Sequence, residues 1–467
     1  MRCILSRRKT IEDPELSRRD KILYGSAGFA DAATYALVST FLLFYLTTIA
    51  GIQPALAGSL VAFGSIWDAV TCPVFGYLSD NCHSRMGRRR PFLLMGSVPL
   101  AACTMFLFTA ISAGLAVKVV YYVIVSMIYW SAFSCFFIPY MAFGAELTHN
   151  YDERTILRSY TSIANNIGGI VGGVCPTIAI DYLCSSGISR NTSWQVTALV
   201  IGILTFCAIM LCFFGFKDRD IPKPKEQHAE KFSVKKMFRD YIDVLRIKPL
   251  LLLISASIIS LIGITMFNSD RLYFLTYNMG FNGAQISLVL FICSCFGFII
   301  PFVLNAMTRW FDKRRSFLIV IGGSSLIVAA FRFIGVTGWP TLIIMMAFFA
   351  LCNTGYWQLM PTLLYDVGEY DEYYNGKNRI GSIMSLQSLA EAAAEALAIQ
   401  LLGIILQLVG FNGALEVQSD FTLSWISTCL MIVPVIFTII ACIFIYKYPI
   451  TREVFQEIQQ KLEDRKS

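Results

Sequence analysis

The chain has 467 residues, of which 56% are hydrophobic and only 15% are charged. A soluble domain has roughly 25% charged residues, so this composition excludes an ordinary soluble protein. The net charge of +7 does not indicate a nucleic-acid binder, because the basic residues are concentrated in the loops between long apolar runs. These runs reach the ~18 residues that cross ~30 Å of hydrocarbon, and they predict an all-α protein that crosses a membrane many times.

Basic residues are distributed unequally between the two ends of the predicted spans. The segments before the first span and after the second, sixth and eighth carry seven, four, ten and four Lys or Arg, and the opposite loops carry almost none. By the positive-inside rule, both termini lie in the cytoplasm and the protein resides in the cell membrane. We place the twelve spans at residues 22–49, 55–80, 91–113, 117–147, 158–183, 194–216, 249–278, 284–308, 316–336, 340–367, 379–409 and 421–447.

A long charged segment, residues 217–248, separates the sixth span from the seventh. We therefore expect one six-helix bundle at 22–216 and a second at 249–447, joined by this cytoplasmic loop. A cytoplasmic N-terminal segment, 1–21, and a cytoplasmic tail, 448–467, complete the chain. The first 21 residues are too polar for a cleaved signal peptide, so the first span is expected to act as an uncleaved insertion signal.

The two predicted bundles resemble each other at matched places. RRRPFLL (88–94) follows the second span and KRRSFLI (313–319) follows the eighth. The segments after the fourth and tenth spans each carry a proline, an acid, Tyr-Asp-Glu and an arginine in the same order. Two six-helix repeats are the pattern expected of a major facilitator transporter, with the binding site between the halves near mid-membrane.

Charged residues inside the first half's spans predict a functional centre. A charge at the bilayer centre costs ~3 kcal/mol or more on insertion scales, so it requires a partner, water or a function. Asp31 shares a helical face with Tyr35, and Asp68 lies one turn before Thr71. We expect Arg158 to balance Asp31 or Asp68 across a hydrated cavity. A buried ion pair that only fixes helix register is the alternative.

The second half carries its own intramembrane polar residues. Asn268, Asp270 and Arg271 interrupt the apolar seventh span, and adjacent positions diverge by about 100°, so one of the two charges faces the cavity. Trp357, in a polar and aromatic cluster of the tenth span, can stack against a ring. The eleventh span carries one polar line at i, i+4 spacing, formed by Gln387, Glu391 and Glu395.

Opposite charges flank the helix ends on the predicted cytoplasmic side. They can form a latch between neighbouring helices, although control of topology by Arg and Lys alone is an alternative explanation. The predicted gate residues are Asp80, Arg88, Arg89, Arg90, Glu146, Asp312, Arg314 and Asp366.

The remaining reactive residues do not predict catalysis. The fourteen cysteines lie mostly inside predicted spans without paired spacing, and the three histidines fall in predicted cytoplasmic loops. We find no nucleophile–base pair and no cluster of metal ligands. We therefore expect no enzymatic activity, no bound metal and no cofactor other than a coupling proton or Na⁺.

Three motifs resemble the glycoside–pentoside–hexuronide:cation symporter family, and the similarity covers nearly the whole chain. They are IWDAVTCPVFGYLSD with GRRRPF, IPYMAFGAELTHNYDERT with Arg158, and YDVGEYDEYYNGKNR. The resemblance implies that Asp31 binds sugar hydroxyls with Arg158 as its companion. It also implies that Trp357 is an aromatic platform and that Asp68 holds the coupling cation.

The chain departs from that family at several implied site positions. The second cation aspartate falls at Cys72 and its neighbouring asparagine at Thr71, whereas the hydroxyl suggested for the cation matches Ser134. A thiol adds little for Na⁺, which prefers oxygen ligands, so a proton on Asp68 or uncoupled transport becomes comparably plausible. Phe137 replaces a sugar-binding aspartate, Met141 replaces a tryptophan, and Glu391 lies beside the place of a family lysine, near Ala392 or Ala393.

We therefore expect a secondary transporter that moves a small polar solute, a sugar or glycoside, by alternating access coupled to a proton or sodium ion. The solute would bridge Asp31 and Arg158 in one half and Trp357 with Gln387 or Glu391 in the other. An amphipathic or anionic non-sugar solute, carried by an uncoupled facilitator, is the alternative, and a receptor without a transport cycle is a third. The expected partners are the solute and the bilayer, with a monomer as the working unit and no nucleic acid.

Overall fold

The computed structural model describes residues 16–147, 151–217, 242–376 and 379–466. Most of the predicted N-terminal segment, 1–15, and of the middle loop, 218–241, lies outside the described residues. Within the described part, twelve helical segments are long and apolar enough to cross a membrane. The prediction of an all-α, multi-pass membrane protein with twelve spans is confirmed.

The first six spans form one bundle. Their helices are α1 (Arg18–Thr48), α2 (Pro54–Asp80), α3 (Arg90–Leu107), α4 (Leu115–Glu146), α5 (Tyr151–Gly173), α6 (Cys175–Ser185) and α7 (Arg190–Gly215). α1 packs along α5 and α7, while α3 packs against α4 and α7. At the start of α1, Ser17 and Asp20 form a capping box, which satisfies amide groups that the first helical turn leaves free.

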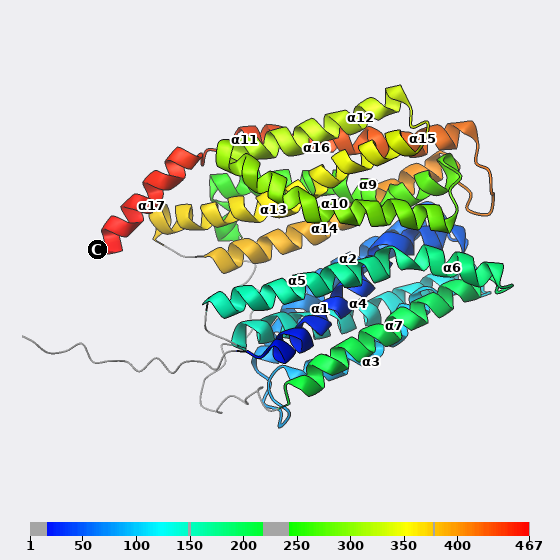
Figure 1. The fold of residues 1–467 in the computed structure, drawn as a ribbon, viewed down its shortest axis with the longest axis horizontal. Coiled ribbons are helices and arrows are strands. Elements are labelled where there is room, and N and C mark those ends of the chain that lie inside the picture. Colours follow the sequence, from blue (N-terminus) through cyan, green and yellow to red (C-terminus); the bar gives the residue numbers. More distant parts are fainter. Residues whose placement is uncertain (1–15, 148–150, 218–241, 377–378, 467) are drawn as a thin grey trace, which may run out of the picture.

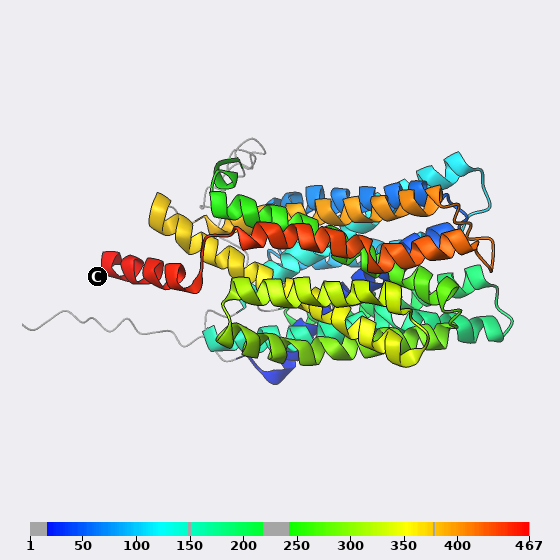
Figure 2. The same cartoon turned by 90° about the horizontal axis from the view of Figure 1, so that it is seen from above.

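The last six spans form a second bundle, with a C-terminal helix beyond it. The elements are α9 (Lys248–Tyr273), η1 (Phe274–Asn278), α10 (Gly283–Trp310), α11 (Lys313–Phe317), η2 (Leu318–Gly323), α12 (Ser324–Ile334), α13 (Trp339–Asn375), α14 (Ile380–Leu408), α15 (Asp420–Met431), α16 (Val433–Tyr446) and α17 (Arg452–Lys466). Figures 1 and 2 show the two bundles side by side, with α17 projecting from the end where the described chain starts and finishes.

Several spans differ from their predicted form, among them the fifth, the seventh and the tenth. The fifth begins earlier and divides at Val174 into α5 and α6, because Pro176 cannot donate the hydrogen bond that a continuous helix requires. The tenth continues to Asn375, beyond the predicted end at 367. The polar residues 268–271 leave α9 unbroken, and the helix changes to a π-helical turn only at Phe274.

The two bundles meet most closely at the end opposite the termini. There α2 packs on α14, where Gly58 and Gly403 let the backbones approach. The Thr47 hydroxyl lies 2.7 Å from the Tyr273 hydroxyl, which joins α1 to α9. Thr177 of α6 also forms a hydrogen bond with Ser287 of α10.

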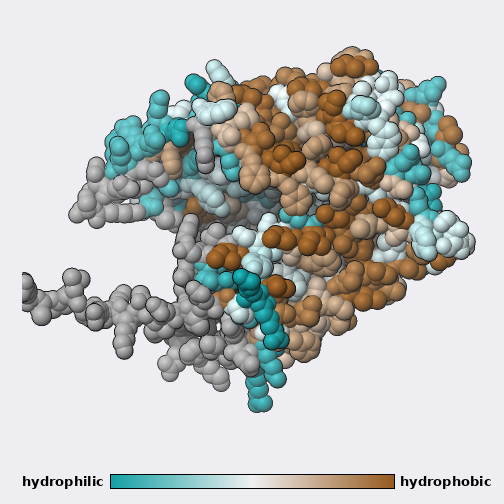
Figure 3. Space-filling model, viewed as in Figure 1, coloured by the Kyte–Doolittle hydropathy of each residue, from teal (hydrophilic) through white to brown (hydrophobic). Residues whose placement is uncertain are grey.

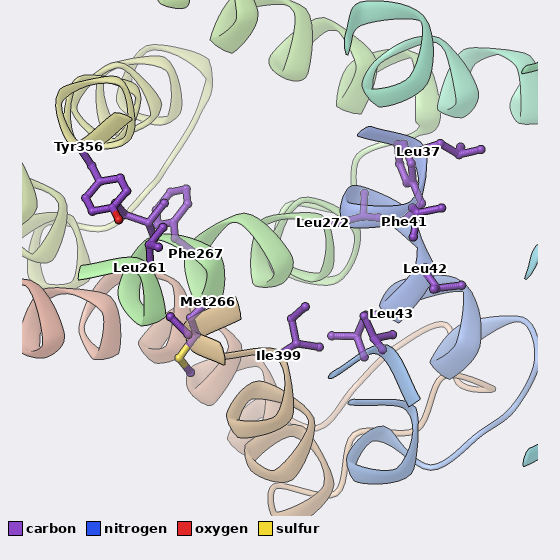
Figure 4. Packing of buried hydrophobic residues seen from close by; sticks show 14 of the residues in the cluster. Leu37, Phe41, Leu42, Leu43, Leu261, Met266, Phe267, Leu272, Tyr356 and Ile399 are labelled. Carbon is purple, nitrogen blue, oxygen red and sulfur yellow. The ribbon is translucent and has the colours of Figure 1, made fainter. Parts of the chain in front are cut away.

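Apolar side chains fill the contact between the bundles near that closed end. Figure 4 shows Leu37 and Phe41 of α1 beside Leu272 of α9, and Leu43 of α1 close to Ile399 of α14. All five side chains are buried in one hydrophobic cluster. This packing excludes water from the closed end, so the space between the bundles has no aqueous connection to the outside at that end.

The opposite end is hollowed between the bundles. Figure 3 shows the surface retreating between them toward the end that carries the termini, while apolar side chains cover the middle of both bundles. The apolar surface matches the hydrocarbon of a bilayer. The polar residues predicted for the site lie on helices that border this hollow and the contact between the bundles.

Candidate functional site

Asp68 of α2 is the centre of a small hydrogen-bonded cluster. Its Oδ1 accepts a 2.6 Å hydrogen bond from the hydroxyl of Ser134, a side chain of α4 that is 0% exposed. The Thr71 hydroxyl lies 2.8 Å from Ser134, and the Cys72 thiol lies 3.6 Å from the same carboxylate oxygen. The structure thus brings together the three residues predicted to couple transport to an ion, with Cys72 beside them.

Tyr35 connects the two bundles near this cluster. Its hydroxyl lies 3.3 Å from both carboxylate oxygens of Glu395 on α14. Asp31, one helical turn earlier on α1, lies within electrostatic reach of both Tyr35 and Asp68. Four acidic or phenolic side chains from α1, α2 and α14 therefore converge where the bundles meet.

The second bundle contributes a continuous polar network. The Gln387 side-chain amide donates hydrogen bonds to Ser257 at 2.6 Å, to Tyr356 at 3.2 Å and to Glu391 at 2.8 Å. These bonds tie α9, α13 and α14 together and orient Glu391 one turn from Glu395. The network holds the Glu391 carboxylate in a defined place, as a solute site requires.

Trp357 lies beside this network on α13. Its ring makes an edge contact with Tyr356 at 5.4 Å between centroids, and its side chain is 47% exposed. Asn353 and Thr354, four and three residues earlier, therefore share its face of the helix. Both of them line the cavity between the bundles.

This cavity has a volume of about 330 Å³ and lies between α1 and α5 of the first bundle and α9, α10 and α13 of the second. The predicted residues Asn268 and Arg271 line it. Asp270 instead is 0% exposed, and neither of its oxygens has a partner among the described residues. Of the two adjacent charges, Arg271 is therefore the one at the cavity.

Arg158 does not make the ion pair expected of it. It is exposed on α5, and no salt bridge to Asp31 or Asp68 is present in the described part of the chain. Its guanidinium contacts the Met141 sulfur, at 4.0 Å. Gly168 of α5 packs against Phe29 and Ala33 of α1, so Asp31 lies about ten residues further along the bundle than Arg158, which is on the first turns of the span.

An aromatic wall borders the acidic cluster on α4. The Phe133 ring lies 6.1 Å from Tyr35 and stacks on Phe137 at 5.5 Å between centroids. Trp130 contacts the same Tyr35 ring edge-on at 6.2 Å. Apolar rings thus border the carboxylates in the first bundle, although Trp130 and Phe133 are themselves buried.

The predicted gate residues of the first bundle form one ion-pair network. Arg89, which is 3% exposed, donates to Asp80 and to Glu146, each at 2.7 Å, and Arg88 reaches the same two acids at 2.5 and 3.3 Å. Burial by itself lowers the pKa of Arg89, but the hydrogen bonds and charges of Glu146 and Asp80 raise it above its ordinary value. The network ties α2 to the end of α4.

The gate residues of the second bundle are arranged similarly but with other partners. Lys313 binds Asp366 of α13 at 2.7 Å, whereas Asp312, expected in the latch, makes no ion pair with any described residue. Arg314 donates to the carbonyl of Tyr448 and stacks on Tyr446, as Arg90 does with Phe213.

The two loop motifs make similar contacts. Arg89 and Lys313 each bind the acid of a following helix, Glu146 and Asp366 respectively. All of these ion pairs join helices of the same bundle.

Some polar residues at the site were absent from the sequence prediction. Ser257 anchors the Gln387 network, and Asn166 and Thr40 line the cavity. The serines of the seventh span and the pair Asn165–Asn166 were visible as polar residues in apolar runs. Small hydroxyl groups cost little in a membrane helix, however, so they did not stand out from structural residues.

The chain is similar to known proteins over nearly its whole length. Residues 23–452 match the family described as MFS/sugar transport protein. The isoprimeverose transporter of Lactiplantibacillus pentosus is 24% identical over 95% of this chain and 91% of its own length. The glucuronide carrier protein homolog of Escherichia coli (strain K12) is 24% identical over 97% of each chain, and the putative sulfoquinovose importer of the same organism is 25% identical over 97% and 95%.

Solved structures share the fold at lower sequence identity. A D-xylose-proton symporter aligns with a TM-score of 0.61 and 16% identity, over 92% of this chain and 97% of that chain. The nucleoside transporter NupG aligns with a TM-score of 0.66 and 12% identity, over 92% and 100%. The predicted twelve-helix, two-bundle transporter fold is confirmed by these likenesses.

Proposed function

We propose that this chain, which belongs to the MFS/sugar transport protein family, is a symporter that moves a sugar or glycoside by alternating access. Membership of that family makes it a membrane transporter of a small solute rather than an enzyme. The solute class, the coupling ion and the roles of individual residues are the proposal. The match to this family agrees with the resemblance to the glycoside–pentoside–hexuronide:cation symporters.

The observation that carries the proposal is the convergence of Asp31, Tyr35, Asp68 and Glu395 where the bundles meet. Carboxylates inside membrane helices are costly unless they face water or a partner. Sugar hydroxyls are donors that carboxylates accept strongly, so these acids can hold a hydroxylated solute. The Trp357 ring, exposed on the second bundle, offers a face on which a pyranose ring can stack.

A glycoside fits the walls better than a fully polar sugar. Phe133 and Phe137 form stacked rings beside Tyr35, and Phe137 replaces an aspartate implied by the resemblance. Relatives named for isoprimeverose, a glucuronide and sulfoquinovose support a hydroxylated ring as the shared part of the solute. The apolar wall would receive an aglycone or the less polar face of the sugar.

Asp68 is the proposed coupling group, and the proton is the proposed ion. Its cluster supplies one carboxylate, the hydroxyls of Ser134 and Thr71, and the Cys72 thiol. Small hard cations are bound by several oxygen ligands, which a thiol does not provide. A single carboxyl that exchanges hydrogen bonds with Ser134 can instead take up and release a proton.

The space between the bundles is open at the end that carries the Lys- and Arg-rich loops. By the positive-inside prediction this end faces the cytoplasm, and the protein would lie in the cell membrane with both termini inside. The ion pairs of the gate residues join helices within each bundle. The bundles can therefore move relative to each other while each stays intact.

An uncoupled facilitator of an amphipathic solute is the second candidate. It is favoured by the aromatic wall of α4 and by the absence of a second carboxylate at Cys72. Flux of this kind would be unaffected by a proton or sodium gradient. The coupling experiment described in the Discussion separates the two candidates.

Solute counterflow in reconstituted vesicles tests the function. We expect a labelled sugar or glycoside to enter vesicles that contain the same solute unlabelled. The counterflow rate should fall about tenfold or more in Asp31→Asn, because the neutral amide binds hydroxyls less strongly than a carboxylate. Glu457→Gln in the exposed tail helix is the matched control and should transport normally. Unchanged counterflow in Asp31→Asn would remove this residue from the site.

A further inference from the structure

Tyr35 forms a hydrogen bond between the two bundles. Its hydroxyl lies 3.3 Å from each carboxylate oxygen of Glu395, so a phenol of α1 donates to an acid of α14. The Tyr35 ring is held from within its own bundle, because the buried rings of Trp130 and Phe133 on α4 lie 6.2 and 6.1 Å from it. The bond therefore depends on the position of the second bundle relative to the first.

This bond lies at the inner edge of the apolar contact that closes one end of the molecule. Glu395 is one helical turn before Ile399, which lies close to Leu43 of α1 in Figure 4. The same helix, α14, also packs along α2. Opening of the closed end requires α1 and α2 to move away from α14, and Tyr35 would then move away from Glu395.

Glu395 has acids and phenols around it rather than cations. No Lys, Arg or His forms a salt bridge with it in the described ranges. The titratable groups within electrostatic reach of the pair are Asp31 on α1, Asp68 on α2, Tyr356 on α13 and Glu391 on α14. Helix α9, which also packs along α14, contributes the neutral hydroxyl of Ser257, and its Asp270 and Arg271 lie further toward the closed end. An ionised Glu395 without the phenol would be an uncompensated charge among other acids, which is costly inside a membrane.

We propose that the Tyr35–Glu395 hydrogen bond is a proton-sensitive latch, which holds one end of the transporter closed while Glu395 is ionised and releases it when Glu395 is protonated. A phenol donates more strongly to a carboxylate than to a neutral carboxyl group, so the bond favours the ionised form in the closed arrangement. Once the bundles separate at that end, the protonated form is favoured instead, because the carboxylate has lost its donor. Acid therefore shifts the protein toward opening of the end that is closed here, and alkali stabilises the closed arrangement.

The latch rests on the proposed alternating access and adds a second proton-dependent step to it. Asp68 would couple the solute to a proton, whereas Glu395 would set which conformation the protein prefers at a given pH. The Tyr35 side chain is 36% exposed, which gives water and protons access to the pair. Glu395 lies outside the site residues that the family resemblance implies, and Tyr35 was expected to bind solute rather than the other bundle.

Distances between two spin labels across the closed end test the latch. One label replaces the exposed Ser186 in the loop after α6, and the other replaces the exposed Val417 in the loop after α14, so that they report the separation of the bundles. Attachment through a ketone-bearing amino acid leaves the fourteen native cysteines unlabelled. In the full-length protein in lipid nanodiscs without solute, the ratio of the long-distance to the short-distance population should rise about tenfold from alkaline to acidic pH, as the loss of a charge-assisted hydrogen bond predicts.

Substitutions then assign the pH response to the latch. Tyr35→Phe and Glu395→Gln should each raise the long-distance population about tenfold at alkaline pH and remove its pH dependence, and Glu395→Asp should keep part of that dependence. Tyr121→Phe is the control and should behave as the wild type, because the Tyr121 hydroxyl donates to the Phe106 carbonyl within the first bundle. If Glu395→Gln does not fold, Tyr35→Phe, which removes a single oxygen atom, still decides.

Two results would overturn the latch. One is the same distance distribution in the wild type and in Tyr35→Phe at every pH. The other is a pH response that survives in Glu395→Gln and disappears in Asp68→Asn, which would assign the response to Asp68. These samples contain no solute, so a failure of every sugar to show counterflow would contradict the proposed function while the distances still decide the latch.

Discussion

At the scale of single residues, the Asp68 cluster is the proposed determinant of the coupling ion. Ser134 and Thr71 supply oxygen atoms around one carboxylate, and Cys72 supplies sulfur one helical turn away. A carboxylate at that position would complete a set of oxygen ligands suited to a hard cation. With the native thiol at this position, the proposed coupling ion is a proton on Asp68.

Uptake of the solute under defined gradients therefore gives a directional prediction. Uptake by the wild-type protein should be stimulated by an inward proton gradient and not by Na⁺. Uptake by Asp68→Asn should lose the stimulation by protons, and uptake by Cys72→Asp should gain stimulation by Na⁺. Cys72→Asn, which adds size and polarity without charge, should not gain it. Stimulation of wild-type uptake by Na⁺ would contradict proton coupling, and uptake that ignores both gradients would favour the facilitator.

The sequence allowed some of these residues to be placed and not others. Asp31 and Asp68 were predicted to converge, since acids in apolar helices must face a shared polar space, and the structure brings them near each other. Arg158 was expected to neutralise one of them and instead lies beside Met141. All three residues lie in the first bundle, and their relative position depends on how α1, α2 and α5 pack, which no local pattern of residues specifies.

At the scale of helices, the contact between α1 and α5 illustrates how small residues position the site. A Cβ atom at Gly172 would lie 1.9 Å from the Ala33 carbonyl oxygen, so only glycine permits this approach. At Gly169, one turn away, a Cβ atom would meet nothing within 4 Å. The same helix thus contains one glycine packed against α1 and one with open space beside it.

This pair gives a matched test of packing. Gly172→Ala should lower the stability of the purified protein by about 1–3 kcal/mol, the usual cost of overpacking, and lower its melting temperature. Gly169→Ala should keep or raise the melting temperature, because alanine is the better helix former by roughly 0.5–1 kcal/mol. Equal effects of the two substitutions would show that the α1–α5 contact is looser than described.

Helix positions followed from the sequence more closely than helix shape. The apolar run lengths predicted all twelve spans, because each run must cross the same hydrocarbon thickness. The division at Val174 and the π-helical turns at 274–278 and 318–323 were not predicted. Such irregularities depend on tertiary packing around single residues, which hydropathy does not register.

At the scale of the whole molecule, two bundles touch at one end and separate at the other. The closed end is held by Thr47 with Tyr273, Thr177 with Ser287, and the apolar side chains between α1, α9 and α14. The two-bundle arrangement was predictable from the repeated loop motifs. Which end is closed was not, because both states must be accessible to one sequence in an alternating-access cycle.

The central claim, that solute passes through the space between the bundles by opening each end in turn, is tested most directly by locking the closed end. Thr177→Cys and Ser287→Cys together, oxidised to a disulfide across α6 and α10, should abolish solute counterflow, and reduction should restore it. Either single substitution, treated with the same oxidant, controls for the native cysteines and should remain active. Full counterflow by the completely cross-linked protein would contradict the account.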